Sequence, residues 1–531
     1  MYLVIIARNL KGFSLINILR TNYIYIILFF ISNFFLLVNY EGLYWDDWTL
    51  YNQDRRVLVV LFDMLHHDLK GDFYLIISKF FNHIYLFRIF VFISYLLIAY
   101  FTYKVLSSTK LFNKFENKLI SFVSIIIPIH TSITLISINI FLFPVLLFYS
   151  AFFLLTKYYQ SNSIYLKIII LYLFFLSFST NSLLVFYGIV LVYLFYMDNN
   201  QVIKVNCKTI KIYIVKRVDF LLLPIIYFIY KKTFLVPYDL YANYNQISIK
   251  NLLNIGNILV QTYEAMTIEM LVYLLSNIYV ICISALLAFF VSIKINIKEP
   301  IFNNKIILLF GLSAILFILA VFPYAAVNKL PVIENANGRF SLLLGISLAL
   351  TFIGFSASLS KVFYGYKNKV FVFIMSFIII LMVAKNVEQQ YKLNLDWFYK
   401  VSLIENFKQN KVIRDNTTFV INNYLYKKLV FKSMGYYDWT GMLKKAFGDT
   451  KRLMITPSGK KKFPTAYLKL RVYKHYNSFE WNGNLNFIEV NVKENIPLSP
   501  KIQAKLFLYY IFNYEKFLGL AKDLTIVSIK P

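Results

Sequence analysis

The stretch YIYIILFFISNFFLLVN occupies residues 23–39 and contains no Lys, Arg, Asp or Glu. An α-helix needs about 20 predominantly apolar residues to cross a bilayer, so this stretch is a predicted membrane span. Ten further spans are predicted at 87–103, 119–136, 138–156, 164–180, 182–197, 218–235, 270–293, 306–322, 341–360 and 370–385. The sequence therefore predicts a polytopic α-helical membrane protein with about 11 transmembrane helices. Residues 252–268 are amphipathic and are predicted to lie at the interface.

The composition favours a membrane protein over a soluble one. Hydrophobic residues make up 59% of the 531 residues and charged residues 15%, whereas soluble domains carry about 45–50% and about 25%. A net charge of +29 would suggest a nucleic-acid partner in a soluble protein, but abundant Tyr, Phe and Lys are typical of an AT-rich genome. We therefore expect the lipid bilayer, and no nucleic acid, as a partner. The two cysteines form no metal-binding or disulfide pattern.

Charge distribution predicts the topology. If the N-terminus lies in the cytoplasm, Lys and Arg are concentrated in the segments on the inner side, as the positive-inside rule requires. Acidic residues gather instead in the outer loops. The first outer loop, residues 40–88, is long and contains seven of them: Glu41, Asp46, Asp47, Asp54, Asp63, Asp68 and Asp72. The sequence thus predicts a multi-pass protein of a bacterial inner or plasma membrane.

Residues 386–531 differ in pattern from the predicted transmembrane domain, residues 1–385. They are polar, with alternating strand-like runs at 418–422, 452–456, 487–492 and 524–529. Helical patterns lie at about 395–410, 438–447 and 500–521. Trp397, Trp439 and Trp481 are predicted core residues. This pattern indicates one extracytoplasmic α+β domain, placed outside by an odd number of spans.

The segment that follows the first span contains the candidate catalytic residues. It places two adjacent carboxylates, Asp46 and Asp47, between Trp45 and Trp48 at the outer interface, a depth that tryptophan favours. A carboxylate there costs more to ionise than in water, so its pKa rises and it can act as a general base. The competing interpretation is that the tryptophans anchor the interface and one aspartate caps the next helix. The position of the pair in an acidic loop of an acid-poor chain favours the functional interpretation.

This order of features resembles the GT-C superfamily of integral-membrane glycosyltransferases. One span is followed at once by an acidic pair in a long first outer loop, then by many spans and a C-terminal extracytoplasmic domain. The resemblance implies a polyprenyl-phosphate-linked or polyprenyl-diphosphate-linked sugar as donor. It implies transfer at the outer face to a cell-envelope glycan, a lipid or a protein, with Asp46 or Asp47 as base. The C-terminal domain matches no soluble domain of the superfamily, so the acceptor is not carried over.

The leaving phosphate of such a donor needs cations. The candidate substrate-binding residues are Trp45 and Trp48, which could stack on a sugar or prenyl chain, and the cations Arg55, Arg56, Lys231, Lys232 and Arg339. Arg339 opens the tenth predicted span, where a guanidinium can grip phosphate through two hydrogen bonds. The alternatives are an interfacial anchor for Arg339, pairing of the loop arginines with Asp54, and snorkelling of the lysines.

His66 and His67 lie in the same loop, on a helix predicted at 57–69. On that helix Asp63 and His67 would share one face. A divalent cation, Mg²⁺ or Mn²⁺, held with the aspartate pair is therefore one hypothesis for the histidines. Acceptor or phosphate binding is the second hypothesis, and a solvated helix face is the third. No cofactor follows from the sequence with certainty.

Two rival functions remain beside the transferase. An O-antigen or polysaccharide polymerase usually has a central, Arg-rich outer loop, whereas the largest outer region here is C-terminal. A transporter or flippase predicts charges within spans and repeat symmetry, and the predicted spans are almost free of both. No P-loop or dinucleotide-binding glycine motif occurs, which disfavours an ATP-driven pump and a soluble-type nucleotide-sugar enzyme. The transferase hypothesis requires the aspartate pair to lie within a cleft near the outer membrane plane, with Arg339 or Lys231 facing the pair across it.

Overall fold

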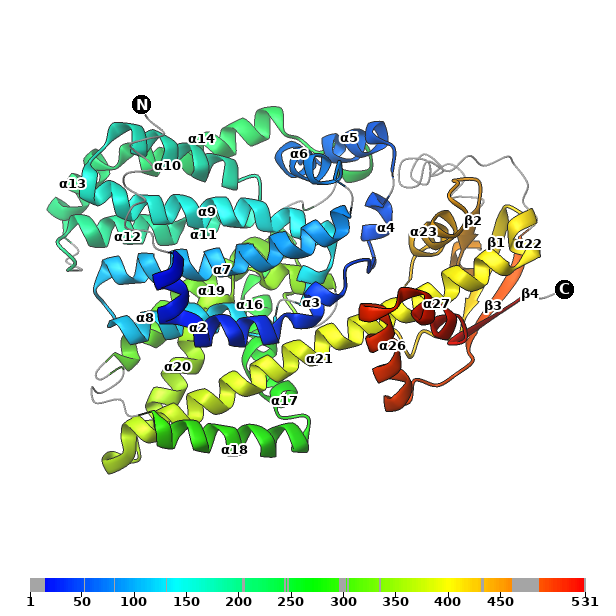
Figure 1. Ribbon diagram of the computed structural model, residues 1–531. Helices are drawn as coiled ribbons and strands as arrows, with labels where there is room; N and C mark the ends of the chain where they lie inside the picture. The colour runs from blue at the N-terminus through cyan, green and yellow to red at the C-terminus, as the bar shows by residue number, and fades with distance from the viewer. Residues whose placement is uncertain are drawn as a thin grey trace.

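The computed structural model describes residues 15–51, 53–80, 82–129, 131–202, 206–242, 245, 248–295, 302, 305–333, 336–430, 434–460 and 487–529. A helical bundle forms the larger part of the molecule, on the left of Figure 1. A smaller unit with a β-sheet lies on the right, and the long helix α21 (Lys367–Gln409) runs from one into the other.

Each predicted span contains at least one helix, and three more helices, Cys207–Lys216, Ile249–Leu253 and Ile255–Glu264, lie outside the predicted spans. The bundle is built from these helices. Their bounds are α2 (Leu15–Ser32), α3 (Phe34–Val38), α7 (His83–Thr109), α8 (Lys114–Ile126), α9 (Ile136–Ser161), α10 (Ile164–Ser177), α11 (Asn181–Phe186), α12 (Gly188–Asp198), α13 (Cys207–Lys216), α14 (Val218–Phe234), α15 (Ile249–Leu253), α16 (Ile255–Glu264), α17 (Met270–Leu274), α18 (Ile278–Lys294), α19 (Ile306–Ala325) and α20 (Gly345–Lys361). A π-helical turn, Ala265–Glu269, joins α16 to α17.

The structure confirms a helical membrane protein but not the predicted count of eleven spans. Among the described residues, five helices are long and apolar enough to cross a membrane, or six if one bent pair is a single span. The five are His83–Thr109, Ile136–Ser161, Asn181–Asp198, Ile306–Ala325 and Tyr364–Gln409, and the bent pair is Ile255–Leu274 with Ile278–Lys294. Three further apolar helices are shorter: Tyr23–Ser32, Ile164–Ser177 and Gly345–Lys361.

Two predicted spans are interrupted for identifiable reasons. The span predicted at 119–136 ends as a helix at Ile126, because Ile127 is extended (ψ 129°) before Pro128 and a residue before proline avoids the helical region. The span predicted at 270–293 is broken at residues 275–277, where the two helices meet at 88°. Asn277 begins the new helix by accepting hydrogen bonds from two of its first amides.

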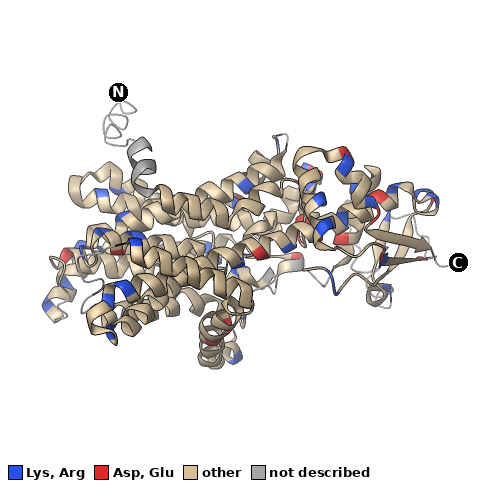
Figure 2. Cartoon of the chain, turned by 60° about the horizontal axis from the view of Figure 1, so that its bottom comes forward, with Lys and Arg blue, Asp and Glu red and all other residues tan. Residues whose placement is uncertain are grey.

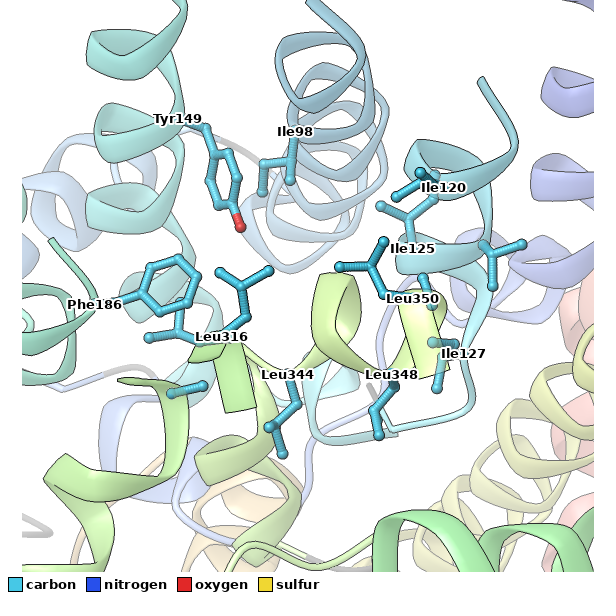
Figure 3. Close-up of a cluster of buried hydrophobic side chains, with 14 of the residues drawn as sticks. Ile98, Ile120, Ile125, Ile127, Tyr149, Phe186, Leu316, Leu344, Leu348 and Leu350 are labelled. Atoms are coloured by element: carbon cyan, nitrogen blue, oxygen red, sulfur yellow. The ribbon is translucent and has the colours of Figure 1, made fainter. Parts of the chain in front are cut away.

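Side chains of the bundle pack into one large apolar core, part of which Figure 3 shows with Ile98, Phe186 and Leu316 among its members. Helices α8 and α20 approach so closely that a Cβ at Gly345 would lie 2.3 Å from the Ser124 carbonyl oxygen. Figure 2 shows that charged residues gather at the ends of the bundle and on the smaller unit. Most of the middle of the bundle is uncharged. This separation is what a bilayer requires of its spanning segments.

The smaller unit contains a mixed four-stranded sheet in the order β2-β1-β3-β4. The strands are β1 (Thr418–Asn423), β2 (Leu453–Ile455), β3 (Ile488–Glu494) and β4 (Thr525–Ile529), and the helices are α22 (Lys411–Asp415), α23 (Tyr436–Phe447), α26 (Pro500–Phe512) and α27 (Tyr514–Lys522). Strand β1 is parallel to β2 and β3, and β4 is antiparallel to β3. All four strands lie within two residues of their predicted bounds. The predicted helix 500–521 is interrupted at Asn513, which caps α27.

Helix α21 crosses the predicted domain boundary at residue 385. It contains neither Gly nor Pro, so nothing in its sequence interrupts the helical hydrogen bonds. The helical pattern predicted separately at residues 395–410 is the last part of α21. There Trp397 is fully buried, as is Trp439 on α23, which confirms both as core residues. Trp481 lies outside the described residues.

The first loop folds into three short helices, α4 (Asp47–Leu50), α5 (Arg55–Met64) and α6 (Asp68–Ile77). Trp48 on α4 is 1% exposed, and its ring lies 6.3 Å from that of Trp397. A Cβ at Gly441 of α23 would lie 2.7 Å from Trp48 Cε3. A second apolar core therefore joins the first loop to the smaller unit.

Replacing Gly441 with Ala should lower stability, because the added methyl has no room beside Trp48. We expect a loss of about 1–3 kcal/mol, typical of overpacking. Gly519 on α27 is the matched control, since a Cβ there meets nothing within 4 Å and Gly→Ala in a helix gains roughly 0.5–1 kcal/mol. Thermal unfolding of the purified full chain should show opposite Tm shifts for the two variants. Equal Tm shifts for the two variants would contradict the close contact between Gly441 and Trp48.

Candidate functional site

The predicted catalytic pair lies where the bundle meets the smaller unit. Figure 1 shows α4 between the bundle and α23. The backbone of Trp45 adopts the left-handed region (φ 46°), which a bulky residue rarely visits. This turn points the side chains of Asp46 and Asp47 into different surroundings.

Asp47 is buried (1% exposed) and serves as a structural clamp. Its carboxylate accepts hydrogen bonds from the Tyr44 amide (3.1 Å) and the Ser137 amide (2.9 Å). Ser137 is the second residue of α9, so Asp47 caps α9 from another part of the chain. Arg88 provides a nearby positive charge and donates to the Gly42 carbonyl (2.8 Å). Burial raises the pKa of Asp47.

Asp46 is half-buried, and it is therefore the accessible carboxylate of the pair. Burial raises its pKa to about 6, while the Arg339 guanidinium and a hydrogen bond from Tyr437 act in the opposite direction and Asp47 adds to the rise. A carboxyl with this pKa is largely ionised at pH 7 yet close enough to neutrality to exchange a proton. Of the two predicted bases, Asp46 has the geometry of a base and Asp47 does not.

Arg339 lies close enough to Asp46 for its charge to act on that carboxylate. Its guanidinium carbon is 4.9 Å from the ring centroids of Trp45 and Phe340. The prediction that Arg339 opens a transmembrane helix is wrong: it belongs to a 3₁₀ turn, Ala336–Ser341, and α20 begins four residues later, at Gly345, than the span predicted from 341. A guanidinium stacked on an aromatic face keeps its hydrogen-bonding edge free for a ligand.

Further charged residues adjoin Asp46 from the smaller unit. On α21, Lys400 and Asp396 form a buried ion pair of 3.4 Å. On α23, Asp438 accepts from the Gly435 amide (2.8 Å), and burial raises the pKa of Asp438 to about 8. The negative charges of Asp46 and Asp396 contribute to that rise. At pH 7 Asp438 is therefore mostly protonated while Asp46 is mostly ionised.

Asp396, Asp438 and Tyr437 were not predicted from the sequence, although the two aspartates share a sequence signal with Asp47. The dipeptide Asp-Trp occurs at 47–48, 396–397 and 438–439, and at the first and last of these a Thr follows. All three tryptophans are buried. Each pair thus combines a core anchor with a carboxylate beside it, and the fold brings all three together.

Among the described residues, the other predicted binding residues are either buried in the core or form no hydrogen bond or ion pair with the carboxylates of the pair. Trp48 is part of the core and offers no face to a sugar or prenyl chain, so its predicted substrate role is wrong. Arg55 and Arg56 are exposed at the start of α5, where Asp54 accepts from the Arg56 amide (2.7 Å). In the described part of the chain, neither arginine side chain forms a hydrogen bond or ion pair with Asp46 or Asp47.

The lysines and histidines gather at a separate place. Lys231 of α14 donates to the Asn181 side-chain oxygen, and Lys232 is exposed, 5.0 Å from the Phe228 ring. The His66 ring packs against Tyr238 (5.8 Å) and the His67 ring against Phe141 (5.6 Å).

The helix predicted at 57–69 is wrong in its bounds. Helix α5 ends at Met64, His66 has φ 46°, and α6 begins at Asp68, an acidic residue that favours a helix start. Asp63 and His67 therefore do not share a helical face. Within the described residues, no group of three or more His, Cys, Asp or Glu side chains could hold a metal ion. The Mg²⁺ or Mn²⁺ hypothesis gains no ligand set from this geometry.

Comparison with known proteins gives no match. No family model matches the chain, and neither a curated protein nor a solved structure resembles it significantly.

The division between the two aspartates predicts different effects on stability. Asp47→Ala leaves two buried amides without an acceptor and Arg88 without its nearby counter-charge, so we expect a loss of about 3–5 kcal/mol. Asp46→Ala removes a half-buried carboxylate whose ionisation the fold disfavours, and we expect a change below about 1 kcal/mol. Denaturant unfolding of the two purified variants at pH 7 measures both. Equal losses would contradict the clamp assigned to Asp47.

Proposed function

We propose that the chain is a membrane glycosyltransferase that moves a sugar from a polyprenyl-phosphate-linked or polyprenyl-diphosphate-linked donor to a cell-envelope glycan, lipid or protein. The observation that carries this proposal is the arrangement around Asp46. A half-buried carboxylate with a raised pKa lies beside an arginine stacked on Trp45. Asp46 immediately precedes α4, which lies between the bundle and α23 (Figure 1), a place that a lipid-linked donor and a polar acceptor can both reach.

Each group has a role in this reaction. Asp46 takes the proton of the acceptor hydroxyl as the hydroxyl oxygen bonds to the anomeric carbon. The bond from that carbon to the donor phosphate oxygen breaks, and Arg339 stabilises the departing negative charge. Tyr437 orients the carboxylate through its hydrogen bond. Trp45 holds the guanidinium by stacking and presents an aromatic surface at the outer interface, in the topology predicted from the sequence.

Protonation states support Asp46 rather than its neighbours as the base. Asp438 is mostly neutral at pH 7, because its pKa is about 8. Asp47 is occupied by two backbone amides and is buried. Of these three carboxylates, Asp46 is the one that is both accessible and mostly ionised at pH 7. The resemblance of the chain's architecture to the GT-C superfamily supports the same assignment, whereas no contact described above favours a polymerase or a transporter.

Replacing Asp46 with Asn should abolish sugar transfer without changing membrane abundance. Loss of a general base typically costs 10²–10⁴-fold in rate. Asp72→Asn is the matched control, since Asp72 is an exposed carboxylate of the same loop. Mass spectrometry of the host's envelope glycans, in a strain that carries only the variant, measures transfer. Normal glycans from Asp46→Asn would end the catalytic assignment.

The pH dependence offers a second test. The wild-type rate should rise through about pH 6, because the base acts only when ionised. The Arg339 charge lowers the pKa of Asp46, so Arg339→Gln should move this midpoint to higher pH as well as reduce the rate. Transfer by the purified full chain from lipid-linked sugar extracted from its host, measured between pH 5 and about 9, gives both midpoints. An unchanged midpoint would show that Arg339 does not act on the base.

A further inference from the structure

A buried lysine contacts the first two turns of α9, the helix that Asp47 caps. Lys70 of α6 is 1% exposed, and its ammonium donates to the Ser179 carbonyl (3.1 Å) in the turn between α10 and α11. It also lies 4.3 Å from the centroid of the Phe141 ring. One carbonyl and one ring face are few partners for an ammonium that can donate three hydrogen bonds.

Two more basic groups converge on the same turn. Lys231 of α14 hydrogen-bonds Asn181, two residues after Ser179. His67 packs edge-on against Phe141, and its Nδ1 is buried without a hydrogen-bond partner. Burial and the charge of Lys231 hold the pKa values of both Lys70 and His67 below their usual range. Lys70 is therefore close enough to Lys231 for their positive charges to repel each other, and both lysines disfavour a charge on His67.

No acidic side chain in the described part of the chain compensates them. The ion pairs found there do not include Lys70 or Lys231. Asp68 and Asp72 of the same helix are exposed, and the positive group that acts on the Asp68 carboxyl is His66. Clustered like charges without a counter-charge are costly in a buried place. An anion would remove that cost.

Two hydroxyl groups lie in the same turn. The side-chain oxygens of Ser179 and Thr180 are buried and have no hydrogen-bond partner. Buried hydroxyls are normally paired, so two adjacent unpaired ones beside two ammonium groups indicate a missing acceptor. Lys231 is partly exposed and gives the group a side open to the surroundings.

We propose that Lys70, Lys231 and His67, together with the hydroxyls of Ser179 and Thr180, bind a phosphate group. A phosphate provides several acceptor oxygens for the ammonium, imidazole and hydroxyl donors, and its negative charge offsets the clustered positive ones. That the phosphate is borne by a prenyl lipid rests on the proposed function. The binding of phosphate itself does not.

Lys70 and His67 contact the same end of α9 that Asp47 caps. Phe141 lies one helical turn after Ser137, whose amide binds Asp47, so both sites use the first two turns of α9. On another path, the Tyr324 hydroxyl donates to Ser182 Oγ (3.1 Å) beside Asn181, and the Arg339 charge acts on Tyr324. The turn that Lys70 and Lys231 contact is thus connected to Arg339 through Ser182 and Tyr324.

Phosphate binding can be measured directly on the purified full chain in detergent. The probes are inorganic phosphate and farnesyl phosphate, with farnesol as the uncharged control, titrated by calorimetry. We expect Lys70→Met and Lys231→Met to weaken binding at least tenfold. Lys232→Met, next in sequence but exposed, should bind like wild type. If both inorganic phosphate and farnesyl phosphate bind, the site recognises the phosphate group alone. If farnesyl phosphate binds but inorganic phosphate and farnesol do not, the site recognises a phosphate carried by a lipid.

The proposal is overturned if wild type binds neither phosphate, or if both lysine variants bind as tightly as wild type. Thermal unfolding checks that the variants fold. If Lys70→Met does not fold, Lys231→Met still decides the test, because Lys231 is partly exposed. Asp46→Asn separates the two proposals, because it should bind phosphate normally while failing to transfer sugar. If phosphate binding depends on Lys70 but the wild-type chain transfers no sugar, the result supports the phosphate site and contradicts the proposed function.

Discussion

The continuity of one helix determines how the two parts of this protein meet. Helix α21 extends over 43 residues, about 65 Å at 1.5 Å per residue, and its apolar first half belongs to the bundle. Its second half carries Asp396, Trp397 and Lys400 into the core shared with the first loop. Since a helix without Gly or Pro resists sharp bending, the smaller unit is fixed to the bundle rather than tethered to it. The surroundings of Asp46 depend on that fixed relation.

Much of the fold follows from local sequence signals. Each predicted span contains an apolar helix, and each predicted strand lies within two residues of the observed one. Hydrophobic length and alternation depend on nearby residues, so a single sequence carries them. The number of helices that truly cross the bilayer does not follow in the same way, because Pro128 and Asn277 divide apolar runs that look continuous.

The candidate site was predictable in position but not in detail. The motif identified Asp46, Asp47 and Trp45, and Arg339 was expected near them. Nothing local distinguishes two adjacent aspartates, since their roles are set by Ser137 on one side and Tyr437 on the other. Those partners lie about 90 and about 390 residues away in the sequence. His67 was assigned to a helix that ends before it, so its buried neighbourhood could not be foreseen.

The second core also imposes an order on biosynthesis. It joins Leu43, Trp48 and Phe62 of the first loop to residues as distant as Leu524. A ribosome delivers the first loop long before the last strand, so these apolar side chains lack their permanent neighbours while most of the chain is being made. The environment of Asp46 is consequently among the last features to assemble. A chain that stalls late in synthesis would hold an assembled bundle and an unassembled site.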